Sequence, residues 1–233
     1  MFKNIRPRPY SRQLAAAVLM ILLVLVPAAS NTARAGGLTG AEASSILTFR
    51  SIGSHDGWIL ESSENSNAGG TMSAGAATLL LGDDKARKQY LSILSFNTSS
   101  LPDNANITKV SLKLKRYDVV GSVNPVTAFL GFMVDIRKGS FKDPSLQLAD
   151  WGVTANITLG PFTISSPGGW YTLNQTAAKT YVNKLATGNG LTQVRLRFQL
   201  NDNNNSDANI LKLNSGNAGA ASRPQLIVEY STP

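Results

Sequence analysis

Short segments in which apolar and polar residues alternate follow one another through most of the chain. In residues 107–117, Leu112 and Leu114 alternate with Lys113 and Lys115. A period of two is the pattern of a β-strand with one buried face and one face in water, as in antiparallel sheets. Further strands are predicted at residues 46–51, 57–62, 77–82, 89–97, 129–139, 158–164, 169–173, 191–200, 209–215 and 224–230.

One segment departs from this pattern and repeats its apolar residues at helical spacing. Ala178, Tyr181, Val182 and Leu185 predict a helix of about three turns, and Gly188 lies where a C-terminal cap is expected. Many short strands, turns rich in Gly, Asn and Ser, and one short helix predict an all-β fold, an antiparallel β-sandwich. The sequence has no repeat of 20 to 50 residues, which argues against propellers and solenoids.

The first 35 residues have the pattern of a secretory signal peptide. A basic beginning without acids leads into 13 uninterrupted apolar residues, Leu14 to Val26, and Ala33-Arg34-Ala35 supplies small residues for cleavage. A membrane span takes about 20 apolar residues, so cleavage after Ala35 is favoured over an uncleaved anchor. We therefore predict a secreted, extracellular protein with a flexible lead-in at residues 36–45 and a single β-sandwich domain at residues 46–233.

Loss of the signal peptide changes the charge of the protein. Removing its five basic residues from the total of 22 leaves 17 against 14 acidic residues, a net charge of +3 in place of +8. This small excess gives little support to a nucleic-acid partner. The absence of cysteine excludes thiol catalysis and thiolate zinc sites. No other apolar run approaches membrane length, so we expect no transmembrane segment in the mature chain.

Four short motifs stand out along the predicted strands. They are a Gly-Asp-Asp turn at residues 82–84, a Phe-x-x-Ser-x-Leu-Pro segment at 96–102, an Ile-x-x-Val-x-Leu-x-Leu strand at 107–114 and an Arg-Pro-x-Leu-x-Val-x-Tyr strand at 223–230. In this order they resemble the DNRLRE-type domain of secreted bacterial proteins, over about residues 46–230. The resemblance implies a jelly-roll-like β-sandwich similar to carbohydrate-binding modules, some of which bind polysaccharide. Such domains are usually attached to other modules, and one that stands alone is expected to be a free-standing binding, matrix or filament protein.

Exposed aromatic rings are the expected contacts for a sugar, because sugar C–H faces pack on flat rings. Trp151 lies in a loop-like context and Tyr117 at a strand end, and these two are the candidate carbohydrate-binding residues. Trp58 and Trp170 each follow a glycine and open an apolar run, so we expect both in the core.

The segment NDNNNSDAN, residues 201–209, is the candidate metal site. Calcium takes six to eight oxygen ligands, and Asp202 and Asp207 would supply the charged ones. The acidic turn at Asp83 and Asp84 is a second oxygen source, and jelly-roll relatives of the resembled family often carry a structural calcium. Asn and Asp are also ordinary turn residues, so a plain connecting loop is the alternative.

Catalytic chemistry is only weakly indicated. His55 is the single histidine and lies in a Gly-rich turn, and no nucleophile motif accompanies it. Asp135 lies within an apolar strand, where burial would perturb its pKa, but a pair with Arg137 or with a basic residue on the adjacent strand is the favoured explanation. The basic cluster at residues 85–88 is interpreted as a solvated turn, with a polyanionic partner as the alternative.

These observations predict a secreted, non-catalytic module that binds polysaccharide at the cell surface or in the extracellular matrix. The alternative is a structural protein that self-associates through sheet edges or its amino-terminal segment to form a matrix or filament. A glycan-active hydrolase is the third hypothesis. No nucleic acid is expected as a partner.

Overall fold

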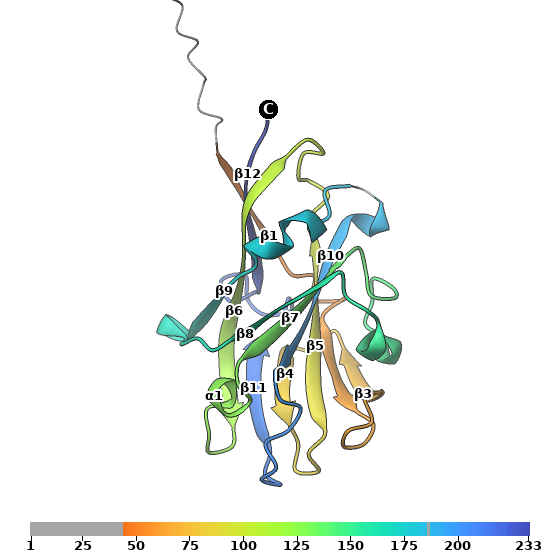
Figure 1. Ribbon diagram of the computed structural model, residues 1–233, viewed down its shortest axis with the longest axis vertical. Helices are drawn as coiled ribbons and strands as arrows, with labels where there is room; N and C mark the ends of the chain where they lie inside the picture. Colours follow the sequence, from red (N-terminus) through yellow and green to blue (C-terminus); the bar gives the residue numbers. More distant parts are fainter. Residues whose placement is uncertain (1–43, 186) are drawn as a thin grey trace, which may run out of the picture. The chain divides into compact units, whose positions relative to one another are not determined.

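Twelve β-strands account for just under half of the described chain, residues 44–185 and 187–233 of the computed structural model (Figure 1). Every pair of neighbouring strands is antiparallel, and the predicted all-β, jelly-roll-like class is confirmed. The elements are β1 (Ser45–Arg50), β2 (Gly57–Glu61), β3 (Gly69–Ala74), β4 (Thr78–Asp83), β5 (Gln89–Asn97), β6 (Asn106–Val120), α1 (Pro125–Ala128), β7 (Phe132–Lys138), η1 (Leu148–Gly152), β8 (Ile157–Phe162), η2 (Pro167–Gly169), β9 (Trp170–Asn174), η3 (Thr176–Tyr181), η4 (Gly188–Gly190), β10 (Leu191–Phe198), β11 (Asn209–Asn214) and β12 (Gln225–Ser231), where η marks a 3-10 turn.

The 15-residue strand β6 connects the two layers of strands. In its first part Leu112 is paired with Leu226 of β12 and with Leu173 of β9. In its last part Val119 is paired with Leu211 of β11. From β11 the strand order continues through β4, β5, β10 and β7 to β8, while β2 pairs with β3 and β5. One strand thus takes part in both layers.

The main core lies between the two layers. Phe96 and Phe132 come from the layer that contains β5 and β7, and Leu112 and Val228 come from the layer of β6 and β12. All four side chains are fully or almost fully buried. Each contributes about 1.5–3 kcal/mol by leaving water, which makes this cluster the main source of the stability of the fold.

A second, smaller core covers the other face of β2 and β5. On β5, Leu91 and Ile93 are buried in this second cluster, whereas Leu94 and Phe96 belong to the main core. The cover is the segment between β7 and β8, whose Phe141, Leu146 and Trp151 pack on that face. Strand β5 is therefore buried on both sides, and the covering segment forms an outer layer.

The predicted three-turn helix around residues 177–185 is wrong. The chain forms only the 3-10 turn η3, and Val182 already has extended backbone angles. The N–H group of Asn183 donates to the hydroxyl of Thr192 on β10, and the N–H group of Leu185 donates to Oδ1 of Asn183. Because these donors are used, they are not available for the i to i−4 bonds of a helix.

The predicted signal peptide, residues 1–35, and almost all of the predicted lead-in at residues 36–45 lie outside the described residues. Within the part of the chain that is described, no helix is long and apolar enough to cross a membrane.

Candidate functional site

The two predicted carbohydrate-binding residues lie in different places. Trp151 is in η1, is 8% exposed and packs in the second core. Tyr117 is on β6, is 64% exposed, and is separated from β5 by β11 and β4 in the strand order. Tyr117 does not line either of the depressions beside Trp151. The structure therefore does not combine the two rings in one site.

Trp151 lies between two adjoining surface depressions of about 290 Å³ and 310 Å³. Both are lined by Asn67, Trp151 and Gly152, and together we call them the Trp151 groove. It runs between η1 and the turn that joins β2 to β3. The first depression is also lined by Gln89, Leu91, Arg195, Arg197 and Asn201, and the second by Ala68, Gly69, Leu148 and Ala149.

Arg195 holds the segment that carries Trp151. Its Nη1 donates to the backbone carbonyl oxygens of Asp150, Trp151 and Val153 at 2.8, 2.8 and 2.9 Å. Its guanidinium also lies 4.7 Å from the centre of the Phe141 ring, within the range of a cation–π contact. Three carbonyl contacts to one planar group fix the position of η1 over the sheet, and with it the Trp151 ring.

Asp135 is the partner of Arg195 across the neighbouring strands β7 and β10. Arg195 Nη2 and Nε lie 2.7 and 2.8 Å from Asp135 Oδ2, Arg197 Nε lies 3.7 Å from the same atom, and Thr158 Oγ1 donates to Oδ1 at 2.6 Å. The expected pair with an adjacent-strand residue is confirmed, whereas Arg137 donates to a backbone carbonyl instead. Two guanidinium groups share one carboxylate, which leaves the groove with a positive excess.

Gln89 is a site residue that sequence reasoning missed. Its side chain is almost fully buried, and its Nε2 has no hydrogen-bond partner among the protein atoms. Its backbone N–H donates to Oε2 of the buried Glu61, whose Oε1 accepts from the N–H of Asn67. A buried donor without a partner costs about 1–3 kcal/mol, and Gln89 itself lines the first depression. The only sequence signal is a polar residue at the start of an apolar strand.

The other two tryptophans are more accessible than predicted. Trp58 and Trp170 are only partly buried, whereas Trp151, expected on the surface, is the most buried of the three. The ring of Trp170 lies beneath the ammonium groups of Lys113 and Lys115, 5.0 and 5.5 Å from its centre. Trp151 is buried because its position in η1 is set by Arg195, an interaction between residues 44 positions apart.

The Asn-rich segment at residues 201–209 is a crossover loop between β10 and β11, which are not paired with each other. Asp202 Oδ1 accepts the N–H of Asn204, and the buried Asp83 accepts the N–H groups of Asn203 and Asn209. Burial raises the pKa of Asp83, and the nearby charges of Asp202 and Asp84 raise it further.

Calcium at this loop stays a prediction. Asp202 and Asp83 lie close enough to affect one another, as the acidic-turn hypothesis requires. Asp207 makes a different contact, since its N–H donates to Oδ1 of Asn205. Among residues 44–185 and 187–233, no three His, Cys, Asp or Glu side chains are grouped so that they could hold a metal ion.

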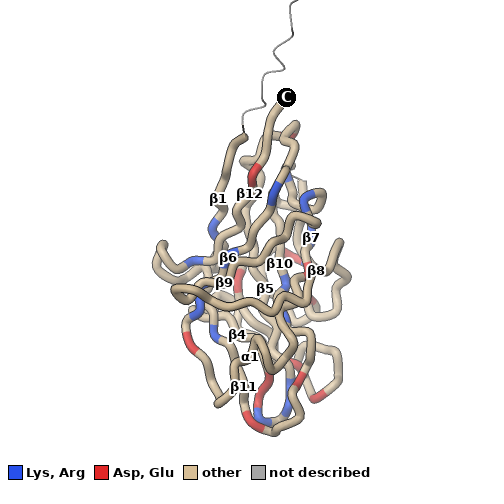
Figure 2. Tube along the Cα trace, turned by 60° about the vertical axis from the view of Figure 1, so that its left-hand side comes forward, with Lys and Arg blue, Asp and Glu red and all other residues tan. Residues whose placement is uncertain are grey.

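The basic cluster at residues 85–88 is tied to its surroundings. Arg87 Nη2 lies 2.6 Å from Glu64 Oε2, and Arg87 Nη1 donates to Asn204 Oδ1. Figure 1 shows the β4–β5 turn and the β10–β11 loop at the same end of the sandwich. Figure 2 shows basic and acidic residues interspersed at this end rather than one sign alone. Arg87 therefore acts as a link between the loops that border the groove.

Comparison of the chain with protein-family models and with curated proteins gives no match. The resemblance to the DNRLRE-type domain therefore stays a prediction.

Proposed function

We propose that the chain is a secreted, non-catalytic module that binds polysaccharide in the Trp151 groove, at the cell surface or in the extracellular matrix. The observation that carries this proposal is the placement of one aromatic residue between two adjoining depressions, beside the unpartnered amide of Gln89. Aromatic surface next to a few fixed polar groups is the usual composition of a site for an organic ligand.

The chemistry of the lining favours a sugar chain. Asn67, Gln89, Asn201 and Arg197 offer hydrogen-bonding groups of the kind that bind hydroxyl and ring oxygens, next to the apolar Trp151. Two adjoining depressions suit consecutive sugar units of a polysaccharide that lies across the protein surface. No acidic residue lines either one.

The same lining supports a non-catalytic role. Glycoside hydrolysis by the usual route needs two carboxyl groups that flank the bond to be cleaved. The acids beside this region are all buried. Asp135 is held by Arg195, Arg197 and Thr158. Glu61 accepts the N–H groups of Gln89 and Asn67, and Asp150 accepts the N–H group of Gln147. A buried carboxyl group held in this way stabilises the fold and is not positioned to act on a glycosidic bond.

Affinity electrophoresis of the full chain through gels that contain different polysaccharides tests the proposal. Two variants change the groove with little strain: Gln89→Leu removes the buried amide, and Asn67→Gly removes the second amide at a position with φ of 53° that glycine adopts freely. We expect each to weaken retardation several-fold. Tyr117→Ala is the matched control on another strand and should bind as the unmodified chain does.

Two results would refute the assignment. The absence of retardation in every polysaccharide would remove the function, and loss of binding in Tyr117→Ala with full binding in the groove variants would move the site to β6.

Self-association is the second candidate function, and the edge strand β1 favours it. Within the described chain β1 pairs only with β12, and it carries Ile46 at 62% exposure. An edge strand with an exposed apolar residue is a template for pairing with another chain. Light scattering should then show assemblies that grow with concentration and are lost in Ile46→Lys, whereas a monomer at all concentrations would exclude this function.

A further inference from the structure

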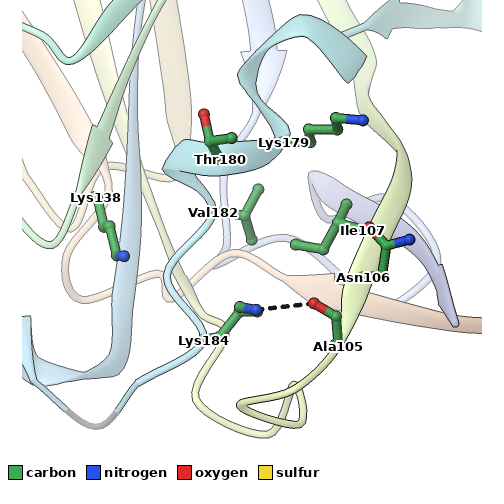
Figure 3. A pocket seen from close by; sticks show the side chains of 8 residues that line it. All are labelled: Ala105, Asn106, Ile107, Lys138, Lys179, Thr180, Val182 and Lys184. Carbon is green, nitrogen blue, oxygen red and sulfur yellow. Dashed lines mark hydrogen bonds between the residues drawn. The ribbon is translucent and has the colours of Figure 1, made fainter. Parts of the chain in front are cut away.

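A further depression, of about 290 Å³, lies apart from the Trp151 groove. It is bordered by the start of β6, the end of β7, and η3 with the segment that follows it (Figure 3). None of its lining residues belongs to the Trp151 groove.

Three lysines line this depression: Lys138 from β7, Lys179 from η3, and Lys184 from the segment after η3. No acidic residue lines it. In the described part of the chain, none of these three ammonium groups forms an ion pair, which is also true of Lys85, Lys113, Lys115 and Lys142, whereas Lys88, Lys109 and Lys212 are paired. The three lysines come from different elements around the depression, and an anion bound there would be attracted by their positive charges.

Lys184 is fixed in place rather than free in water. Its Nζ donates to the backbone carbonyl oxygen of Ala105 at 2.8 Å, and its side chain is only partly exposed. Figure 3 shows this bond crossing from the segment after η3 to the start of β6. An ammonium group has three donors, so two remain for a ligand after one is used to hold the side chain in position.

The apolar part of the lining comes from Ile107 and Val182, whose side chains are 6% and 2% exposed. A surface of this kind suits the carbon skeleton of an organic molecule better than a hydrated inorganic ion. The volume lies near the lower limit for ligand sites, which corresponds to one small molecule or one residue of a larger one.

From this arrangement we infer that the lysine-lined depression binds an oxyanion group, a carboxylate or a phosphate, carried on a small organic molecule or on one sugar unit. Lys184 and Lys138 make charge-assisted contacts to the oxyanion, Lys179 adds positive charge at the border, and Ile107 and Val182 contact the carbon atoms. The site is lined by three lysines and is separate from the groove, whose lining combines Trp151, amide side chains and two guanidinium groups.

Isothermal titration calorimetry on the full chain tests the inference with three probes: glucuronate, glucose 6-phosphate and neutral glucose. We expect one or both anions to bind, with affinity that falls as salt is added, and glucose not to bind. The anion that binds more tightly identifies the oxyanion, carboxylate or phosphate. Binding of neither anion at millimolar concentration, or equal binding of glucose, would overturn the inference.

The variant Lys138→Gln/Lys184→Gln should lose at least tenfold in affinity for the anion. Its matched control is Lys113→Gln/Lys115→Gln, which removes the same charge beside Trp170 on another part of the surface and should bind within about twofold of the unmodified chain. Circular dichroism confirms that both variants are folded. Equal loss in both would show a general charge effect and would refute a site at the depression.

Discussion

Arg195 and Asp135 lie directly opposite each other on β10 and β7, with Nη2 and Oδ2 2.7 Å apart, beneath the segment that carries Trp151. The side chain of Arg195 is 10% exposed and that of Asp135 is 2% exposed. Because the same guanidinium binds three backbone carbonyl oxygens of η1 and its end, the ion pair connects the sheet to the outer layer. The shape of the Trp151 groove therefore depends on a buried charge pair.

Replacing Arg195 by leucine should lower the free energy of unfolding by about 3–5 kcal/mol, because Asp135 would stay buried without its main partner. The carbonyl groups of Asp150, Trp151 and Val153 would lose their donor as well. Urea unfolding followed by circular dichroism measures the change.

The double variant Asp135→Leu/Arg195→Leu is the control for this prediction. Removal of both charges leaves only Arg197, whose side chain is partly exposed, without its carboxylate, so the double variant should be less destabilised than Arg195→Leu alone. A loss below about 1 kcal/mol in the single variant would contradict the role of the pair.

Gln89→Leu should separate binding from stability. The substitution removes a buried amide nitrogen that has no protein partner, so the free energy of unfolding should stay the same or rise by up to about 1 kcal/mol. A loss of more than about 2 kcal/mol in urea unfolding would show that this amide is satisfied in the folded protein and would remove it from the site.

Stability should depend on pH through buried acids. Burial raises the pKa of Asp56 to about 6 from its ordinary value of 3.8. Between pH 3.8 and about pH 6 the folded protein keeps a proton on Asp56 that the unfolded chain has lost. The contribution of Asp56 to the free energy of unfolding is therefore complete below pH 3.8 and is lost as the pH rises to about 6. The free energy of unfolding should be about 2 kcal/mol larger at pH 4.5 than at pH 7.5.

Asp56→Asn is the control for this pH effect. Asp56 accepts the N–H groups of Ser95 and Gly216 at 3.0 and 2.8 Å, and an amide keeps only one acceptor, so the variant is less stable. Its stability should nevertheless vary less with pH, by under half of the original difference. If the free energy of unfolding of Asp56→Asn still differs by the full amount between pH 4.5 and pH 7.5, Asp56 is not the source of the effect. Burial also raises the pKa values of Asp83 and Asp150, so these two acids would be replaced next.

The calcium prediction for Asp202 and Asp207 is tested by thermal melting in calcium and in EDTA. An ion that binds only the folded state adds about 2.7 kcal/mol at a hundred times its Kd, which raises the melting temperature. The difference should disappear in Asp202→Asn/Asp207→Asn and persist in Asp103→Asn, an exposed acid elsewhere. Identical melting in calcium and EDTA would contradict the prediction.

Period-two alternation predicted eleven of the twelve strands, because apolar and polar residues mark the two faces of a strand directly, as in residues 107–117. It missed β3, Gly69–Ala74, which has Met72 as its one large apolar residue. The loop-like context of Trp151 misled because its burial depends on Arg195, and the helical spacing of residues 177–185 is overridden by the bond from Asn183 to Thr192. The pair of Asp135 with a basic residue on the adjacent strand was predictable from strand pairing. The amide of Gln89 was not, because a missing partner is visible only in three dimensions.

Strand β6 has a consequence for how the domain unfolds. Its residue Lys115 is paired with β9, and the next residue, Arg116, is paired with β11, so adjacent peptide units belong to different layers. Neither layer can open without disturbing the strand on which the other is assembled. The domain should accordingly lose both layers in a single cooperative transition, with the same midpoint for backbone and tryptophan signals.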